Sequence, residues 1–211
     1  MTALENWNSR IDALGLIAIL RGLRPEECIE VVETLAGCGF GIVEVPLNSP
    51  RPYESIKLLS EQFGNKLIIG AGTVLDGHQA DDALAAGAEL IVAPNFNEKV
   101  ADKAVRGGAI YCPGIATPTE AFSALNAGAH ALKLFPAEVI TPAVVKALHA
   151  VLPDNTLTIP VGGIDKDNIK RYLDAGAGAF GIGSSLYKPG LSISDIQQRA
   201  EQLLAAFDAV K

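Results

Sequence analysis

The sequence predicts an α/β protein, a (β/α)8 TIM barrel with an extra helix at the N-terminus. Three observations support this fold class: eight short apolar runs, helical stretches of ten or more residues between most of them, and a glycine pattern that ends many of the helices. Strands that alternate with helices form a parallel sheet buried on both faces. Eight such units close a barrel. A doubly wound open sheet is the main alternative.

The apolar runs are the predicted strands, because each is short and bounded by turn residues. They lie at residues 16–20, 42–46, 67–70, 90–93, 109–112, 131–135, 157–161 and 179–182. A chain of 211 residues, 49% of them hydrophobic, can bury one substantial core. We therefore expect a single barrel domain over residues 1–211.

The predicted helices carry recognisable end signals. Several end in Gly or Gly-Ala just before an apolar run, as in "LAGCGFGIVEV" and "LAAGAELIVAP", because the residue after a last helical turn often adopts a left-handed conformation. Thr117 to Glu120, "TPTE", forms a capping-box pattern, and Thr141-Pro142 repeats the Thr-Pro start. Further helices are expected near residues 5–14, against the N-terminal face of the barrel, and near 193–210.

Composition excludes several classes of function. With 17 basic and 24 acidic residues and a net charge of −7, the chain is a poor match for nucleic acid or an anionic membrane. The first fifteen residues lack the layout of a signal peptide, and no apolar run approaches about 18 residues. The three cysteines form no C-x-x-C pair and the three histidines have no metal-ligand spacing. We expect a cytoplasmic protein without metal or cofactor.

Charged residues interrupt two of the predicted strands. Side chains of a barrel strand alternate between the interior and the surrounding helices. In "ALKLF" the two leucines share the helix-facing side, so Lys133 should point inward, and the same parity turns Glu44 of "IVEVP" inward. Arg21 and Thr73 follow the first and third strands, at the C-terminal mouth where barrel active sites lie.

Lys133 and Glu44 allow two interpretations. They could form a buried structural ion pair, which often gains little over apolar packing. Alternatively, burial could lower the pKa of the lysine so that its uncharged amine attacks a ketone and forms a Schiff base. A nearby carboxylate would then move the protons that imine formation and carbon–carbon cleavage require. The sequence favours the second interpretation.

Small residues end the last two predicted strands, in "VGGI" (161–164) and "GIGSS" (181–185). Backbone N–H groups can approach an anion closely at such residues, and a helix N-terminus would add favourable partial charge. Loops after strands seven and eight are a recurrent phosphate site in barrels. We expect a phosphate here, although single glycines at such places are often only tight turns.

These motifs together resemble a known family. "IAILRG", "VEVPLNSP", "IGAGTV", "IVAPN", "ALKLFP", "VGGI" and "GIGSSLY" stand in the order found in the 2-keto-3-deoxy-6-phosphogluconate/6-phosphogalactonate aldolases, from about Leu14 to Gly190. The resemblance implies a homotrimeric class I aldolase without a cofactor. Such an enzyme cleaves a phosphorylated keto-deoxy sugar acid into pyruvate and glyceraldehyde 3-phosphate.

The resemblance also assigns roles to residues. Lys133 is similar to the Schiff-base lysine and Glu44 to the proton shuttle of the family. Arg21 and Thr73 match residues that hold the pyruvate carboxylate. The phosphate cradle corresponds to Gly162, Gly163, Gly183 and Ser184.

The two branches of the family differ in one hydroxyl configuration of the substrate. The gluconate branch usually has an arginine in a "TLRT" stretch, whereas the corresponding stretch here is "PLNS", with Asn48. Val161 stands where that branch usually has threonine, and "APN" replaces "SPG". These differences favour the galactonate substrate, with Asn48 and Val161 as specificity residues. "FPAE" (135–138) instead matches gluconate enzymes, so that substrate, or activity on both, stays open. A phosphosugar isomerase or epimerase on the same barrel and a non-catalytic phosphosugar-binding protein would also use the phosphate loops.

Overall fold

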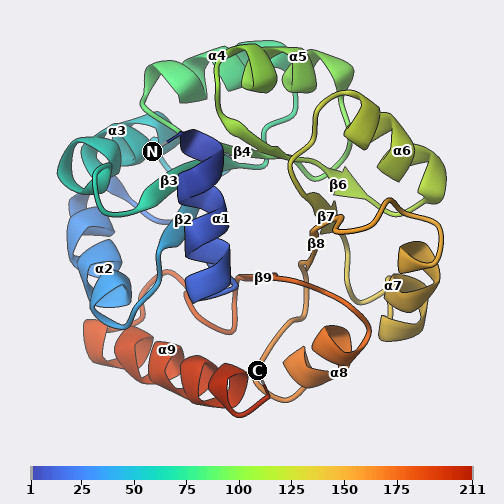
Figure 1. Ribbon diagram of the computed structural model, residues 1–211. Helices are drawn as coiled ribbons and strands as arrows, with labels where there is room; N and C mark the ends of the chain where they lie inside the picture. Colours follow the sequence, from blue (N-terminus) through green and yellow to red (C-terminus); the bar gives the residue numbers. More distant parts are fainter. Residues whose placement is uncertain (1, 211) are drawn as a thin grey trace.

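The computed structural model describes residues 2–210, in which helices and strands alternate around a ring (Figure 1). The strands are β1 (Leu16–Ile19), β2 (Ile42–Pro46), β3 (Ile68–Gly72), β4 (Leu90–Val92), β5 (Ile110–Cys112), β6 (Gly114–Ile115), β7 (Leu132–Leu134), β8 (Thr158–Pro160) and β9 (Phe180–Ile182). The helices are α1 (Ala3–Ala13), α2 (Pro25–Gly37), α3 (Pro52–Phe63), α4 (Gly77–Ala85), α5 (Glu98–Arg106), α6 (Pro118–Asn126), α7 (Pro142–His149), α8 (Ile169–Asp174) and α9 (Ile193–Asp208). The predicted domain, residues 1–211, extends one residue beyond the described part at each end.

The strands close into a barrel, which confirms the predicted fold class. One sheet has the order β5-β4-β3-β2-β1-β9 and the other β6-β7-β8, and every pairing is parallel. Pro113, which has no N–H to donate, separates β5, which matches the fifth predicted strand, from β6, a short strand that was not predicted. A parallel bridge between Val161 and Gly181 joins the strand-eight segment to β9 and completes the ring.

Alternation along the strands sorts side chains into two packed clusters. Inside the barrel lies an apolar cluster with Ile17, Ile19, Ile42 and Ile159. Outside it, Val43, Val45, Leu132 and Leu134 pack with the helices. The inward positions of β2 and β7 that break the apolar pattern are Glu44 and Lys133, both buried. The predicted parity of these strands is therefore confirmed.

Helix α1 closes one end of the barrel. It lies across the middle of the ring in Figure 1, and its Trp7 is only 1% exposed and packs with the interior cluster. Thr2 caps this helix with a capping box. Because the other end of the barrel carries the C-terminal ends of the strands, α1 leaves that end free for a functional site.

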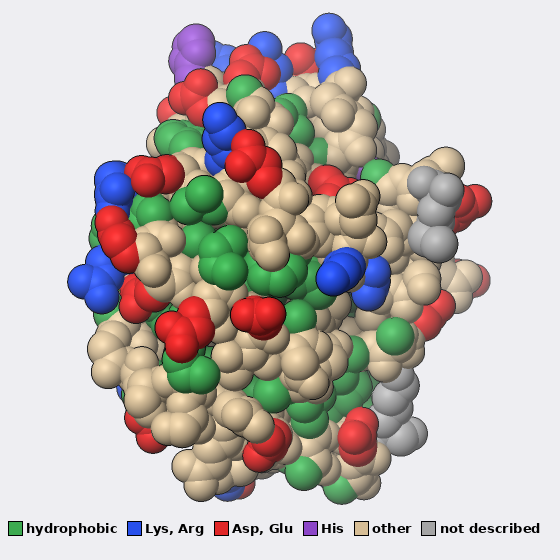
Figure 2. Space-filling view, turned by 90° about the vertical axis from the view of Figure 1, so that its left-hand side faces the viewer, with side chains coloured by type: hydrophobic (Ala, Val, Ile, Leu, Met, Phe, Trp, Pro, Cys, Tyr) green, Lys and Arg blue, Asp and Glu red, His purple; other side chains and the backbone are tan. Residues whose placement is uncertain are grey.

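The predicted helix starts are mostly observed. Thr117 forms the expected capping box with Glu120, whereas Thr141 precedes Pro142 without a side-chain cap. Over α2 and α3, the surface mixes acidic, basic and apolar side chains without a large field of one sign (Figure 2). Across the described residues, no helix has the length and apolar character needed to cross a membrane.

Candidate active site

A cavity of about 780 Å³ opens at the C-terminal ends of the strands. Eight of the ten predicted site residues line it: Arg21, Thr73, Lys133, Val161, Gly162, Gly163, Gly183 and Ser184. They come from the ends of β1, β3, β7, β8 and β9, which are far apart in the sequence. The closed barrel thus brings together residues that the sequence could place only strand by strand.

Lys133 reaches the cavity from the middle of β7. Its side chain is 4% exposed, and its Nζ lies 4.8 Å from the centre of the Phe135 ring. Burial lowers the pKa of the amine, and the charge of Arg21 lowers it further, while Glu44 and Cys112 act in the opposite direction. A larger fraction of this amine is therefore uncharged near neutral pH than for an exposed lysine.

Glu44 lies inside the barrel on β2, where it is 2% exposed. Burial raises the pKa of its carboxyl to about 7, although the charges of Lys133 and Arg21 favour ionisation. Its Oε2 has no hydrogen-bond partner among the described residues, and no salt bridge within 4 Å joins it to Lys133. The arrangement is therefore not the direct structural ion pair, and it leaves a buried carboxylate oxygen free to exchange a proton.

Gly72 gives this carboxylate its space. A Cβ atom on Gly72, at the end of β3, would overlap Oε2 of Glu44. The strand register pairs Glu44 with Gly70, two residues earlier, but a Cβ atom on Gly70 would meet the Leu90 side chain instead. Gly72 is thus the small residue on β3 that leaves room for the carboxylate.

Arg21 lies at the rim of the cavity, directly after β1. Its Nη1 donates a hydrogen bond to Oδ1 of Asn48 at 2.5 Å. Asn48 itself is exposed and is not among the residues that line the cavity. The structure therefore places Asn48 where it orients the guanidinium, whereas Val161, the other predicted specificity residue, lies on the cavity wall.

Thr73 has an unusual backbone conformation. Its φ of 56° lies in the left-handed region, which is uncommon for threonine. Such outliers concentrate at functional sites, where the surrounding structure holds them in place. This conformation turns the residue into the cavity directly after β3.

Two loops at the ends of β8 and β9 form the predicted phosphate cradle. Gly162 and Gly163 have φ values of 107° and 63°, and consecutive residues of this kind can present backbone N–H groups to an anion. Ser185 Oγ donates to the carbonyl of Ile164 at 2.8 Å and ties the two loops together. The contribution of a helix N-terminus stays a prediction: α8 begins at Ile169 and α9 at Ile193, but the N–H groups of Leu186 and Tyr187 both donate to the carbonyl of Gly183, so one helical turn starts directly after β9.

Two charged residues of the cavity were not predicted as site residues. Lys188 lines it from the loop after β9, in a "YKPG" segment whose Tyr187 is buried and donates to Oε1 of Glu27 at 3.2 Å. Glu138 lines it from the turn after β7. The sequence could have indicated both residues as site residues, because each follows the C-terminal end of a predicted strand.

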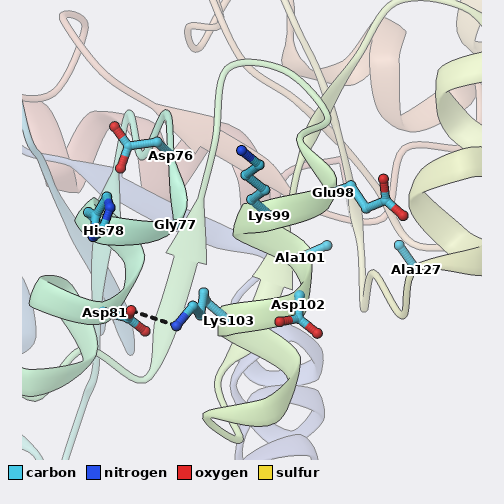
Figure 3. Close-up of a pocket in the computed structure, with 10 residues that line it drawn as sticks. All are labelled: Asp76, Gly77, His78, Asp81, Glu98, Lys99, Ala101, Asp102, Lys103 and Ala127. Atoms are coloured by element: carbon cyan, nitrogen blue, oxygen red, sulfur yellow. Dashed lines mark ion pairs between the residues drawn. The ribbon is translucent and has the colours of Figure 1, made fainter.

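A second hollow, of about 750 Å³, lies outside the barrel between α4 and α5. In Figure 3, Asp76 and His78 lie on one side of it and Glu98 on the other, and an ion pair of 2.7 Å joins Asp81 to Lys103. Its charged groups do not converge on one point. Within residues 2–210, no cluster of three or more His, Cys, Asp or Glu side chains is suited to hold a metal ion.

Comparisons with known proteins show the family of the chain. The family model for KDPG and KHG aldolase matches residues 8–203. The chain belongs to the KDPG and KHG aldolase family. This aldolase is 45% identical to the 2-dehydro-3-deoxy-6-phosphogalactonate aldolase of Escherichia coli K12, over 95% of this chain and 97% of that protein. It is 47% identical to the probable enzyme of the same name from Rhizobium meliloti, over 92% of each chain.

Solved structures of aldolases have the same fold as this chain. A structure described as native KDPGal superposes with a TM-score of 0.91 at 44% identity, over 93% of this chain and 96% of that one. Relatives named 2-dehydro-3-deoxy-phosphogluconate aldolase are more distant, at 28% to 34% identity. The family resemblance read from the motifs is confirmed, and the galactonate branch is the nearer one.

Proposed function

We propose that this chain is a class I aldolase that cleaves 2-dehydro-3-deoxy-6-phosphogalactonate to pyruvate and D-glyceraldehyde 3-phosphate. The observation that carries the proposal is a buried lysine that lines the cavity and a buried carboxyl group in the barrel interior, close enough for the two charges to affect each other and with opposite pKa shifts. Burial lowers the pKa of Lys133 and raises that of Glu44. Near neutral pH, the site therefore offers an amine that is more often uncharged than that of an exposed lysine, together with an acid–base group whose pKa is close to the working pH.

The first half of the reaction joins substrate to enzyme. The uncharged Nζ of Lys133 attacks the C2 ketone, and protonation of the resulting alkoxide gives a carbinolamine. The carbinolamine hydroxyl then takes a second proton and leaves as water, which produces a protonated imine. Glu44 supplies both protons in its neutral form, and between the two transfers its carboxylate takes up the proton that the attacking nitrogen loses. It therefore ends this half as a carboxylate, with one proton retained on the imine.

The second half breaks the carbon–carbon bond. A base removes the proton of the C4 hydroxyl, the C3–C4 bond breaks, and its electron pair moves to the imine nitrogen to give an enamine. The C4 fragment leaves as the aldehyde. C3 of the enamine then takes a proton, and water releases pyruvate and free Lys133. Glu44 serves both proton transfers, because a group with a pKa of about 7 exists in both forms at neutral pH.

The two ends of the cavity fit the two charged ends of this substrate. Arg21, oriented by Asn48, and Thr73 hold the carboxylate beside Lys133. The phosphate binds at the other end, on the backbone of Gly162, Gly163, Gly183 and Ser184. Val161 places two methyl groups between these ends, at the part of the wall that a sugar hydroxyl approaches.

The galactonate epimer is preferred over the gluconate epimer for two reasons. The relatives named for the galactonate substrate have the higher sequence identity. In addition, Val161 offers no hydrogen bond to a substrate hydroxyl, so the epimer that needs a polar partner there is disfavoured. Activity on both epimers would still fit the same chemistry.

The assembly and location follow from the family resemblance. We propose a homotrimer, for which light scattering of the eluted protein would give three times the chain mass of 22.0 kDa. We also propose a cytoplasmic location, in keeping with the free thiols of Cys28, Cys38 and Cys112. An isomerase or epimerase would need no inward lysine, and a binding protein would need no acid–base group beside it.

One experiment separates these possibilities. Pyruvate release is measured from each 2-keto-3-deoxy-6-phospho epimer with wild type and Lys133→Ala, and both proteins are incubated with pyruvate and borohydride. We expect galactonate to be the better substrate, the wild type to be labelled, and the variant to be inactive and unlabelled. Equal or reversed preference would overturn the galactonate assignment alone. Full activity of Lys133→Ala would overturn the Schiff-base mechanism.

A further inference from the structure

The side chain of Glu138 lies on the glycine pair that forms one half of the cradle. A Cβ atom placed on Gly162 would lie 2.5 Å from Oε2 of Glu138. A Cβ atom on Gly163 would lie 3.2 Å from both Oε1 and Cγ of the same residue. The carboxylate therefore lies against these two glycines, to which the proposed function assigns the phosphate.

The backbone that carries Glu138 is fixed. The neighbouring Ala137 is 1% exposed, its N–H donates to the carbonyl of Val161 at 2.9 Å, and its own carbonyl accepts from the hydroxyl of Tyr172 at 2.7 Å. The N–H of Ile140 donates to the carbonyl of Pro136 at 3.0 Å. The turn is thus pinned to the loop after β8, and only side-chain torsions can move the carboxylate.

The carboxylate is held by the position of its backbone and not by a charged partner. Within residues 2–210, Glu138 has no side-chain hydrogen bond and no cation within 4 Å. Three cations line the same cavity, namely Arg21, Lys133 and Lys188, but none of them pairs with it. An exposed, unpaired carboxylate can leave the glycine pair by rotation without breaking an ion pair.

Two anions cannot share this position. A phosphate ester carries a charge of about −1.5 to −2 at neutral pH, and like charges a few ångströms apart repel strongly. Either the carboxylate moves when phosphate arrives, or phosphate binds weakly. Both outcomes make Glu138 a determinant of how tightly the cradle binds an anion.

We propose that Glu138 is an internal competitor for the phosphate cradle, a specificity-determining residue whose carboxylate occupies the Gly162–Gly163 loop of the free protein. The substrate phosphate displaces it by rotation of the side chain. Because a substrate is also held by Lys133 and Arg21 at its other end, it can offset this displacement, whereas free inorganic phosphate has only the cradle. This inference rests on the proposed function, since that function assigns the phosphate to these glycines.

The test measures the affinity of inorganic phosphate by calorimetric titration, and by competitive inhibition of pyruvate release. Wild type is compared with Glu138→Gln, which keeps the size of the side chain, and with Glu138→Ala. Glu61→Gln removes the same charge from the exposed surface of α3 and is the matched control. We expect phosphate to bind about five- to twentyfold more tightly to both Glu138 variants. The control should stay within about twofold of wild type.

The possible results distinguish an effect of the charge of Glu138 from an effect of its volume. They also distinguish a failure of this inference from a failure of the proposed function. Unchanged or weaker phosphate binding in both Glu138 variants would overturn the inference. Tighter binding in Glu138→Ala alone would also overturn it, because the effect would then come from volume and not from charge. If the wild type releases no pyruvate from either epimer, the proposed function fails, while the phosphate titration still reports on Glu138 independently.

Discussion

Replacing Gly72 by alanine would test the position of the Glu44 carboxylate with a single methyl group. The new Cβ would overlap Oε2 of Glu44. Gly72 lies within β3 and is not in the left-handed region, so alanine suits its backbone. In its present position, Oε2 has no hydrogen-bond partner among the described residues. Glu44 must therefore shift within a packed interior.

The expected loss of kcat in Gly72→Ala follows from the proton transfers assigned to Glu44. General acid–base groups contribute about 10² to 10⁴ in rate, and they act only within about 2.6–3.2 Å of the reacting atom or through one water. A displaced carboxylate should lower kcat by about 100-fold, which corresponds to about 2.7 kcal/mol of activation free energy. Overpacking the interior should also lower the free energy of unfolding by about 1–3 kcal/mol.

Gly70→Ala is the matched control for this prediction. It adds the same methyl group to the same strand two residues earlier, where the Cβ would lie 3.0 Å from the Leu90 side chain instead of a carboxylate. Both variants should lose stability in urea unfolding, but only Gly72→Ala should lose most of its pyruvate release. If Gly72→Ala retained kcat within about threefold of Gly70→Ala, the assigned position and role of Glu44 would be refuted.

Three further predictions concern Glu44, Val161 and Trp7. Glu44→Gln should lower kcat by about 10² or more and remove the inflection near pH 7 from the pH–rate profile. Because burial raises the pKa of Glu44 from 4.5 to about 7, wild type should lose stability relative to Glu44→Gln as pH rises across this interval, which melting curves at about pH 5 and 8 would measure. Val161→Thr should shift the ratio of kcat/KM toward the gluconate epimer by about tenfold, and an unchanged ratio would remove Val161 from the specificity residues. Trp7→Ala should lower the free energy of unfolding by about 3–5 kcal/mol with kcat almost unchanged, because Trp7 lies at the opposite end of the barrel; a large loss of kcat in folded protein would contradict this.

Strand parity made the centre of the site predictable from the sequence. Period-two alternation places every second residue of a barrel strand inside, so Lys133 and Glu44 could be assigned to the interior before any contact was known. The order of strands and helices then placed their C-terminal ends at one mouth. Regular periodicity and standard connections determine these features, and they are the features that the structure confirms.

Features that depend on loop conformation were less predictable. The sequence predicted a helix N-terminus beside the phosphate cradle; α8 and α9 begin several residues after the cradle, and what starts at Gly183 is a single helical turn that the sequence did not indicate. The hydrogen bond between Arg21 and Asn48 could not be predicted from the sequence, and the role of Asn48 in specificity stays a prediction. The contact between Glu138 and the glycine pair joins two loops that no sequence pattern relates, so only the three-dimensional arrangement reveals it.

The separation of Lys133 from Glu44 answers why a lysine interrupts an apolar strand. A direct salt bridge would stabilise both charged forms and raise the pKa of the amine, which would keep it protonated and unreactive. Here the two groups share the same buried space without a bridge within 4 Å, so desolvation dominates each of them. Arg21 adds a second cation at the mouth, which further disfavours a charged lysine and also offers a partner to the substrate carboxylate. Binding of that carboxylate would neutralise Arg21, and the interior would then favour protonation of the newly formed imine. The same arrangement thus provides a neutral amine for attack and a positive imine for cleavage.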